Sequence, residues 1–451
     1  MDTESILRRY GLFDAKVPRY TSYPPANRFV AEVGRARQPG WISALDPRDP
    51  VSVYVHIPFC RRLCWFCACR TQGTQTLKPV DAYLDDVITE IAKVRDTGPE
   101  GLSMARLHLG GGTPTLLSAD QMERLLDAIE ATFAKADGYE FSVEIDPTEA
   151  SDDVLDCLAR RGMERASIGV QDFEPKVQQA IGRLQSYEET KTVIDRLRSH
   201  GIQSLNIDLL YGLPYQTRES LLATLDQVIT LNPDRLALYG YAHVPHMSKR
   251  QAVIPKDALP STEERYREAC AAERKLVANG YLELGIDHFA LADDSLAKAA
   301  EAGQMRRNFQ GYTDDPCTTL LGFGASAIST FADGFTQNAV STGAYRQRVQ
   351  ATGLAAHKGH VLTADEKTVA EMINSIMCTG SLDLRVLNTV ESVEVDRLVP
   401  LLANLEATFP DAVRRAGTTI ELLPEFNALA RVVAARLDLE LLSEHIHSTA
   451  I

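Results

Sequence analysis

Short apolar runs alternate with longer amphipathic segments from about residue 50 onwards. This rhythm is typical of βα units, in which helices cover a parallel sheet. Six strand candidates are well spaced, at 51–57, 106–110, 140–146, 165–171, 205–211 and 235–242, and two more follow at 281–289 and 320–329. Eight complete units would close a barrel, whereas six units followed by irregular sequence fit an incomplete one. We therefore expect an α/β fold built on a parallel βα barrel, closed or incomplete.

The segments between the strand candidates carry the start and stop signals of helices. Ser118 with Gln121 and Ser261 with Glu264 match capping boxes, in which both side chains bind free backbone N–H groups at a helix start. Glycines at 162, 201 and 280 stand where helices should end, because glycine readily adopts the left-handed conformation of a C-cap. These signals favour helices between the strands.

The two ends of the chain depart from this rhythm. Residues 1–49 lack a clear period and contain the stretch RYTSYP at 19–24, which indicates an extended arm. From about residue 335 the pattern turns mainly helical, with a helix start at Thr363 and a short strand candidate at 418–422. We expect three parts: an N-terminal arm over the active site at 1–49, the barrel at 50–334 and a mainly helical C-terminal domain at 335–451.

Four of the eight cysteines gather just after the first strand candidate, at Cys60, Cys64, Cys67 and Cys69. Thiolates spaced C-x3-C-x2-C suit an iron-sulfur cluster or zinc. If three of them hold a four-iron cluster, the fourth iron stays open and can chelate the amino and carboxylate groups of S-adenosylmethionine. The alternative is zinc held by all four cysteines, but the single residue between Cys67 and Cys69 strains tetrahedral binding by both.

Small and polar residues follow the other strand candidates. They are Gly111, Thr113, Glu144, Gln171, Asp208 and Ala242. In a parallel βα barrel these positions share one rim, where such folds place their chemistry. Glycines 110–112 allow either close approach of a ligand to the backbone or a tight turn. Glu144 and Asp208 can hold ribose hydroxyls or an ammonium group, or cap helices.

Tyr54 and His56 occupy alternate positions of the first strand candidate, so their rings face the same side. In a barrel that side is the interior. His56 is either a functional group or a hydrogen-bonded core residue.

Charge narrows the range of partners. Lys and Arg number 47 against 61 Asp and Glu, which gives a net charge of −14. Such a chain repels nucleic acid and anionic membranes, and no apolar run is long enough to span a bilayer. The N-terminus lacks the pattern of a secretory signal, so we expect a cytoplasmic protein. An anionic substrate would need local cations, for which the candidates are Arg19, Arg61, Arg62, Arg70, Arg306 and Arg307.

The cysteine spacing, together with GGGTPT at 110–115, resembles the radical S-adenosylmethionine superfamily. Further stretches narrow the resemblance: RYTSYP at 19–24, YVHIPF at 54–59, EIDP at 144–147, GVQDF at 169–173, NIDL at 206–209, YGLP at 211–214 and NFQGYT at 308–313. Over most of residues 15–330 the chain is similar to the oxygen-independent coproporphyrinogen III oxidases.

The resemblance implies a three-quarter barrel, a 4Fe-4S cluster and two bound S-adenosylmethionine molecules. It implies that the cluster ligands are Cys60, Cys64 and Cys67. Contacts to the S-adenosylmethionine on the open iron fall on Tyr54, Gly112, Thr113, Glu144 and Ile328. Contacts to the second molecule fall on Phe66, Gly111, Gln171, Arg183, Asp208 and Ala242. Cys69 matches a family cysteine that is not a ligand, and we expect Tyr54 and Cys69 to act in catalysis.

The activity implied is the oxidative decarboxylation of two propionates of coproporphyrinogen III, with an external electron donor and acceptor and a monomeric enzyme. The alternatives are a radical enzyme that acts on haem and a haem carrier without radical chemistry. Carrier relatives generally lack the RYTSYP stretch and the cysteine at 69, which favours the oxidase.

Two stretches depart from the family pattern. Gly182 precedes Arg183 where the family often has asparagine. At 437–440 the sequence is LDLE, where the family commonly has Phe-Asp-x-Tyr. The first departure concerns the local backbone and the second the packing of the C-terminus.

Overall fold

A computed structural model describes residues 2–387, 395–438 and 450–451. Two residues of the 437–440 stretch, Leu439 and Glu440, lie outside the described residues. Within the described part, the largest sheet has thirteen strands, in the order β1-β17-β16-β15-β14-β2-β5-β6-β7-β8-β9-β11-β10. No helix among the described residues is long and apolar enough to cross a membrane.

The centre of this sheet is parallel and forms the incomplete barrel. Its strands are β14 (Leu320–Phe323), β2 (Val51–Ile57), β5 (Ser103–Gly111), β6 (Ala134–Ile145), β7 (Arg165–Gln171), β8 (Ser204–Tyr211) and β9 (Arg235–Gly240). All six well-spaced candidates are therefore parallel strands in the predicted order. The edges of the sheet are antiparallel and do not meet, so the expectation of an incomplete α/β barrel is confirmed.

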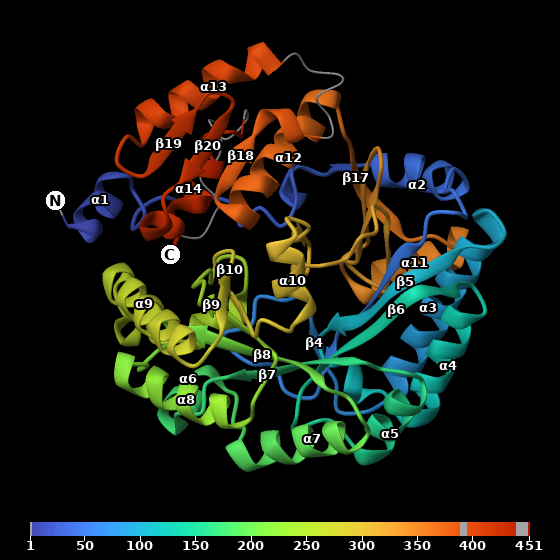
Figure 1. Ribbon diagram of the computed structural model, residues 1–451. Helices are drawn as coiled ribbons and strands as arrows, with labels where there is room; N and C mark the ends of the chain where they lie inside the picture. The colour runs from blue at the N-terminus through green and yellow to red at the C-terminus, as the bar shows by residue number, and fades with distance from the viewer. Residues whose placement is uncertain (1, 388–394, 439–449) are drawn as a thin grey trace.

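Helices cover the outer side of the parallel strands (Figure 1). They are α3 (Lys78–Thr97), α4 (Ala119–Glu130), α5 (Asp152–Arg160), α6 (Pro175–Ile181), α7 (Tyr187–Ser199), α8 (Arg218–Thr230) and α9 (Thr262–Ala278). Both predicted capping boxes are present, at Ser118 and Ser261. Glycines 162, 201 and 280 have positive φ after their helices, as expected of C-caps.

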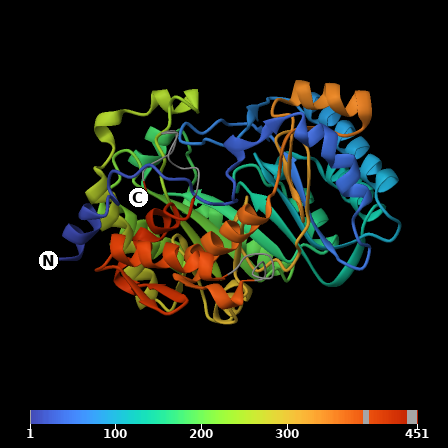
Figure 2. The same ribbon diagram turned by 90° about the horizontal axis from the view of Figure 1, so that it is seen from above.

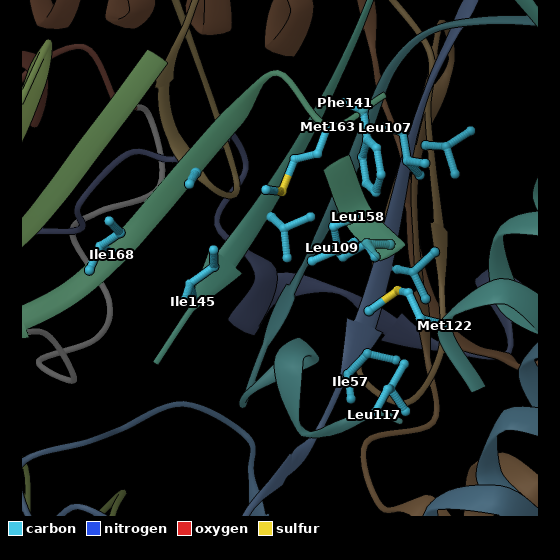
Figure 3. Close-up of a cluster of buried hydrophobic side chains, with 14 of the residues drawn as sticks. Ile57, Leu107, Leu109, Leu117, Met122, Phe141, Ile145, Leu158, Met163 and Ile168 are labelled. Atoms are coloured by element: carbon cyan, nitrogen blue, oxygen red, sulfur yellow. The ribbon is translucent and has the colours of Figure 1, made fainter. Parts of the chain in front are cut away.

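The apolar side of each strand packs against this helical layer. Figure 3 shows Leu107 and Phe141 from neighbouring strands near Leu158 of α5, with Met122 of α4 and Ile168 of the next strand farther along the same cluster. These side chains are buried to 1% exposure or less. Because side chains alternate along a strand, the positions between them must face inward, and those positions carry polar residues.

Both edges of the sheet differ from the prediction. The candidates 281–289 and 320–329 are hairpins rather than single strands: β10 (Leu282–Leu284) with β11 (His288–Ala290), and β14 with β15 (Ile328–Phe331). Gly285 and Gly324 have positive φ and break each run. The sheet then continues past residue 334 through β16 (Gly334–Asn338), β17 (Ala356–Val361) and β1 (Val30–Ala31). The antiparallel edge of the sheet thus extends past residue 334, whereas the parallel strands of the barrel all lie before it.

The last part of the chain forms a separate helical layer with a small sheet. It contains α12 (Ala364–Thr379), α13 (Val395–Thr408) and α14 (Ala430–Ala434), with β18 (Ser381–Asp383), β20 (Thr419–Leu422) and β19 (Val413–Ala416). Thr363 caps α12 as predicted. The remaining elements are β3 (Phe59–Cys60), β4 (Gln72–Gly73), α10 (Ser295–Glu301), β12 (Arg306–Asn308), β13 (Gly311–Thr313) and α11 (Thr342–Thr352).

The N-terminal segment contains more regular structure than the predicted irregular arm. It has helices α1 (Thr3–Arg9) and α2 (Val33–Ser43) on either side of an extended stretch. The start of the chain packs against the C-terminal layer through Leu7, Leu12 and Phe13. Figure 2 shows both chain ends on the same side of the molecule, beside the C-terminal helices.

Asp438 fastens the extended stretch to the C-terminal layer. Its side chain is fully buried. The hydroxyl groups of Tyr20 and Tyr23 each donate a hydrogen bond to it at 3.3 Å, and Arg28 Nη2 binds it at 3.1 Å. The departure at 437–440 therefore retains the carboxylate that holds the RYTSYP stretch in place.

A second buried carboxylate, Glu90 of α3, joins the parallel strands to the antiparallel edge. It accepts hydrogen bonds from the Gly324 N–H and Asn338 Nδ2, each at 2.9 Å, and from the Tyr345 hydroxyl at 2.7 Å. Burial raises the pKa of Glu90 to about 7. Without Glu90, three buried polar groups would lose their partner.

We predict that Glu90→Ala lowers the free energy of unfolding by about 3 kcal/mol, because unsatisfied buried polar groups cost about 1–3 kcal/mol each and partial relaxation offsets some of the sum. Urea denaturation followed by circular dichroism measures the change. Glu164→Ala, at an exposed position, serves as the control and should change stability by less than about 0.5 kcal/mol. Equal stability of the two variants would show that Glu90 does not join these elements.

Candidate active site

The cysteine loop, residues 60–69, follows β2 and is held by neighbouring backbone. The Trp65 N–H donates to the carbonyl of Ile181 at the end of α6. From the segment after β9, Gln251 Nε2 donates to the Phe66 carbonyl at 2.7 Å and Ser248 Oγ to the Cys67 carbonyl at 3.0 Å. These hydrogen bonds hold the backbone of the loop from two sides. The positions of its thiols therefore do not depend on contacts between the thiols.

Arg183 connects this loop to the barrel. Its Nη1 lies 3.7 Å from Cys64 Sγ and 3.1 Å from the Asp146 carboxylate, and its Nη2 donates to the Gly169 carbonyl at 2.8 Å. Gly182, just before it, has φ +67, a conformation that asparagine also tolerates. A side chain there would meet the Trp65 ring at 2.9 Å. Glycine and asparagine both adopt this backbone conformation, but an asparagine side chain at 182 would require the Trp65 ring to move.

The three cysteines suit a cluster better than a single ion. Among the described residues, no group of three His, Cys, Asp or Glu side chains converges closely enough to hold one metal ion. Zinc ligands must converge, since each Zn–S bond is about 2.3 Å long, whereas thiolates on separate irons of a cluster stand farther apart. Cys60, Cys64 and Cys67 offer the soft thiolate donors that a 4Fe-4S cluster requires, so this donor set fits such a cluster.

The fourth cysteine differs from the other three. Cys69 is exposed, and it lines both the barrel cavity described below and a smaller cavity of about 330 Å³ beside Arg250. A hydrogen bond with the Cys69 side chain lowers the pKa of Cys67 to about 6. Cys69 thus combines contact with a predicted ligand and access to the cavity.

The glycine run is required by the protein's own packing. A Cβ at Gly110 would lie 2.7 Å from Glu144, one at Gly111 2.5 Å from the His56 ring, and one at Gly112 2.6 Å from a backbone oxygen of Phe59. Gly111 also has φ +111. Gly110 and Gly111 end strand β5, and the Gly111 N–H lies 2.9 Å from Glu144 Oε2.

The polar interior of the strands encloses a cavity of about 530 Å³, here called the barrel cavity. Its lining includes Cys69, Glu144 and Asp208. Burial raises the pKa of Glu144, but hydrogen bonds from His108 and the Gly111 N–H outweigh this, so the net shift is downward. Burial and the nearby Glu144 charge raise the pKa of Asp208. Two carboxylates in one cavity thus differ in their readiness to take a proton.

Tyr54 and His56 do face the interior, as predicted. The Tyr54 hydroxyl lies 2.9 Å from His56 Nδ1, and the Tyr54 ring stacks on His108 at 5.8 Å between centroids. His56 is 7% exposed and its Nε2 lies 3.2 Å from the Arg70 carbonyl, so it is a hydrogen-bonded core residue. The sequence analysis missed His108, although it alternates with Leu107 and Leu109 as an inward residue should.

The remaining predicted residues lie at the ends of strands or in the segments that follow them. Gln171 ends β7 with φ +72, an uncommon value for a residue other than glycine and typical of functional strand ends. Thr113 is buried below the cysteine loop, and Ile328 begins β15. Phe66 packs beside α6, on the side of the loop that faces Val177 and Ile181. The structure thus gathers these residues near the loop but does not place all of them in the barrel cavity.

A second cavity of about 660 Å³, here called the arm cavity, adjoins the first. Ala242 lines it, and Arg19, Tyr239, Asp287 and Arg307 line both cavities. Of the predicted cations, Arg19 and Arg307 therefore reach the site. Two others are engaged elsewhere: Arg61 pairs with Glu149 at 3.2 Å, and Arg62 donates to the Leu184 carbonyl.

An incomplete parallel βα barrel with a three-cysteine loop after its first strand defines a radical S-adenosylmethionine enzyme. A sequence model described as the Radical SAM superfamily matches residues 54–228, which include the loop and β2 to β8.

Full-length relatives specify the family. The chain is 49% identical over 439 residues to "Coproporphyrinogen III oxidase, anaerobic 1" of Cereibacter sphaeroides, with 97% of each chain covered. It is 45% identical to the oxygen-independent coproporphyrinogen III oxidase of Paracoccus denitrificans over the whole of both chains. The solved coproporphyrinogen III oxidase of Escherichia coli, titled a radical SAM enzyme, superposes with a TM-score of 0.90 at 36% identity, covering 95% of this chain and 100% of that one. The chain belongs to the family of oxygen-independent coproporphyrinogen III oxidases.

The cysteine loop yields a direct prediction. Cys60→Ala, Cys64→Ala and Cys67→Ala should each abolish the brown colour of the anaerobically reconstituted protein, because each removes an iron ligand. Cys69→Ser, the matched control two positions past the last ligand, should keep the colour. Visible absorbance and iron content measure this. A colourless wild type that carries one zinc per chain after iron reconstitution would contradict the cluster assignment.

Proposed function

We propose that this chain converts two propionates of coproporphyrinogen III to vinyl groups without oxygen, giving protoporphyrinogen IX. The observation that carries the proposal is the joint placement of Cys69, Glu144 and Asp208 in a barrel cavity beside the three-cysteine loop. The named relatives support it over the two alternatives, a radical enzyme acting on haem and a haem carrier.

Each conversion removes one hydrogen atom, one electron and one carbon dioxide from a propionate, leaving a vinyl group. When bound, the cluster supplies the electron that splits S-adenosylmethionine and so provides the radical that takes the hydrogen atom. The electron that leaves the substrate needs an external acceptor, and the cluster needs an external donor. Both partners, the monomeric state and the cytoplasmic location stay predictions.

We assign Cys60, Cys64 and Cys67 as cluster ligands. Glu144 is held by the Gly111 N–H and by His108 at 3.4 Å, so its carboxylate is oriented to bind hydroxyl or ammonium groups of a bound S-adenosylmethionine. The stacked rings of Tyr54 and His108 support this carboxylate from below. The other proposed contacts to this molecule are Gly112, Thr113 and Ile328.

A second S-adenosylmethionine is proposed beside the first. Asp208 and Ala242 support it, since Asp208 lines the barrel cavity and Ala242 the adjoining one. The further proposed contacts are Phe66, Gly111, Gln171 and Arg183. Arg183 already binds Asp146 and two other groups, so its role is to hold the site's shape as well as any ligand. Equilibrium binding to the cluster-loaded protein tests the number of molecules bound.

Cys69 has the position of a group that acts on the substrate. Cys69 lines the barrel cavity, whereas the buried Cys64 lies beside Arg183, with Sγ 3.7 Å from Nη1. We therefore propose that Cys69 takes part in the reaction at the propionate rather than in binding the cluster.

The proposed function predicts that the reduced, cluster-loaded protein releases carbon dioxide and forms vinyl product from coproporphyrinogen III under anaerobic conditions. Cys69→Ser should still cleave S-adenosylmethionine but lose decarboxylation by at least about a hundredfold, within the range of a removed acid–base group. Gas analysis and chromatography of the porphyrins measure both. Wild-type protein that consumes S-adenosylmethionine without releasing carbon dioxide would exclude the oxidase, and full activity of Cys69→Ser would exclude its catalytic role.

A further inference from the structure

Five of the described arginines line the arm cavity, and three of them, Arg19, Arg265 and Arg307, form what we call the arginine cluster. They come from the extended N-terminal stretch, from α9 and from β12, three segments far apart in the sequence. Among the described residues, no carboxylate lies within 4 Å of any of their guanidinium groups, although ion pairs of that length are common elsewhere in the chain. The cluster therefore concentrates positive charge without direct counter-ions.

The contacts that the cluster does make are with neutral groups. Arg19 Nη2 donates to the Gly240 carbonyl at 3.1 Å, and Arg307 Nη2 donates to the Arg19 carbonyl at 3.3 Å. Arg307 lies over the Tyr312 ring at 4.1 Å. Its Nε and Nη1, and the Nε of Arg265, are buried without a hydrogen-bond partner. Enclosed cations with unsatisfied N–H groups are costly unless an anion joins them.

Carboxylates are present in the arm cavity but do not neutralise the cluster. Asp287 lines both cavities and is bound to His288 Nδ1 at 2.6 Å. Glu273, Glu283 and Glu425 line the arm cavity beyond that distance from the three guanidinium groups. Arg19 and Arg307 also line the barrel cavity, so two of the three cations, together with Asp287, lie where the two cavities meet.

We propose that the arginine cluster binds the propionates of the substrate that are not decarboxylated. This inference rests on the proposed function, because it takes the reacting propionates to lie in the barrel cavity near Cys69. Guanidinium groups bind carboxylates through paired hydrogen bonds, which makes arginine suited to this task. The reaction removes two of four carboxylates, so the product keeps the two that the cluster holds.

An experiment can distinguish binding of a reacting propionate from binding of a retained one. A cation that binds a reacting propionate contributes to substrate affinity alone, since the product lacks that group. A cation that binds a retained propionate contributes to the affinity for substrate and for product alike. The ratio of the two losses in a variant therefore identifies which carboxylate the arginine holds.

The test compares the KM for coproporphyrinogen III with the inhibition constant of protoporphyrinogen IX, both measured anaerobically with the cluster-loaded, full-length enzyme. Arg265→Met and Arg307→Met should each raise both constants roughly tenfold or more, the scale of a lost charged hydrogen bond. Arg265→Lys should recover part of the loss, because it restores the charge. Arg218→Met, at an exposed arginine that pairs with its neighbour Glu219, should leave both constants unchanged.

Visible absorbance and thermal unfolding confirm that each variant retains its cluster and fold, and Arg265→Lys provides the reading if Arg265→Met is unstable. A rise in KM without a rise in the inhibition constant would overturn the inference, as would unchanged values of both. Failure of the wild type to decarboxylate coproporphyrinogen III would instead overturn the proposed function itself. The two failures are therefore distinguishable.

Discussion

In a strand of a barrel every second side chain points inward, and in this chain the inward positions are polar on one parallel strand after another. Tyr54, His108, Glu144 and Asp208 reach the interior by this rule, while their neighbours in the sequence pack under the helices. Barrels of this kind usually fill their interior with branched apolar side chains. Here the polar lining leaves a cavity instead, and the proposed action of Cys69 on a reacting propionate depends on this cavity.

The catalytic loop depends on a different kind of support. Cys60 ends strand β3, but the cysteines that follow it lie on irregular backbone, so hydrogen bonds from the end of α6 and from residues 248–251 must hold the loop in place. The position of the N-terminal arm depends on Asp438, whose carboxylate accepts hydrogen bonds from Tyr20, Tyr23 and Arg28. Because the arm carries Arg19 to the boundary of both cavities, one buried carboxylate in the C-terminal layer also positions a residue of the site.

Local signals made the barrel predictable. Strands β2 and β7 begin and end at the predicted residues, because β-branched and apolar residues alternate there over their whole length and turn residues follow. The two hairpins were not predicted, because their strands are short. Gly285 and Gly324 divide them, but a glycine in the sequence does not by itself distinguish a turn between two strands from an ordinary loop. The extension of the sheet past residue 334 was not predicted, because β16 and β17 pair antiparallel with each other rather than repeating the βα unit.

For the site, the cysteines and Tyr54 were predicted from spacing and alternation. The sequence gives no local sign that Arg265 approaches Arg19, or that Asp438 binds Tyr20, because these contacts join segments more than two hundred residues apart. The role of the glycine run was open for the same reason: Glu144 and His56, which occupy the space of a side chain there, come from other strands.

The proposed function requires one cavity to bring S-adenosylmethionine and a substrate propionate together for hydrogen transfer. This requirement is tested with coproporphyrinogen III that carries deuterium on its propionate side chains, by mass spectrometry of the 5′-deoxyadenosine formed in an anaerobic turnover. We expect deuterium in the 5′-deoxyadenosine in step with the release of carbon dioxide. Unlabelled 5′-deoxyadenosine formed during decarboxylation would contradict this requirement.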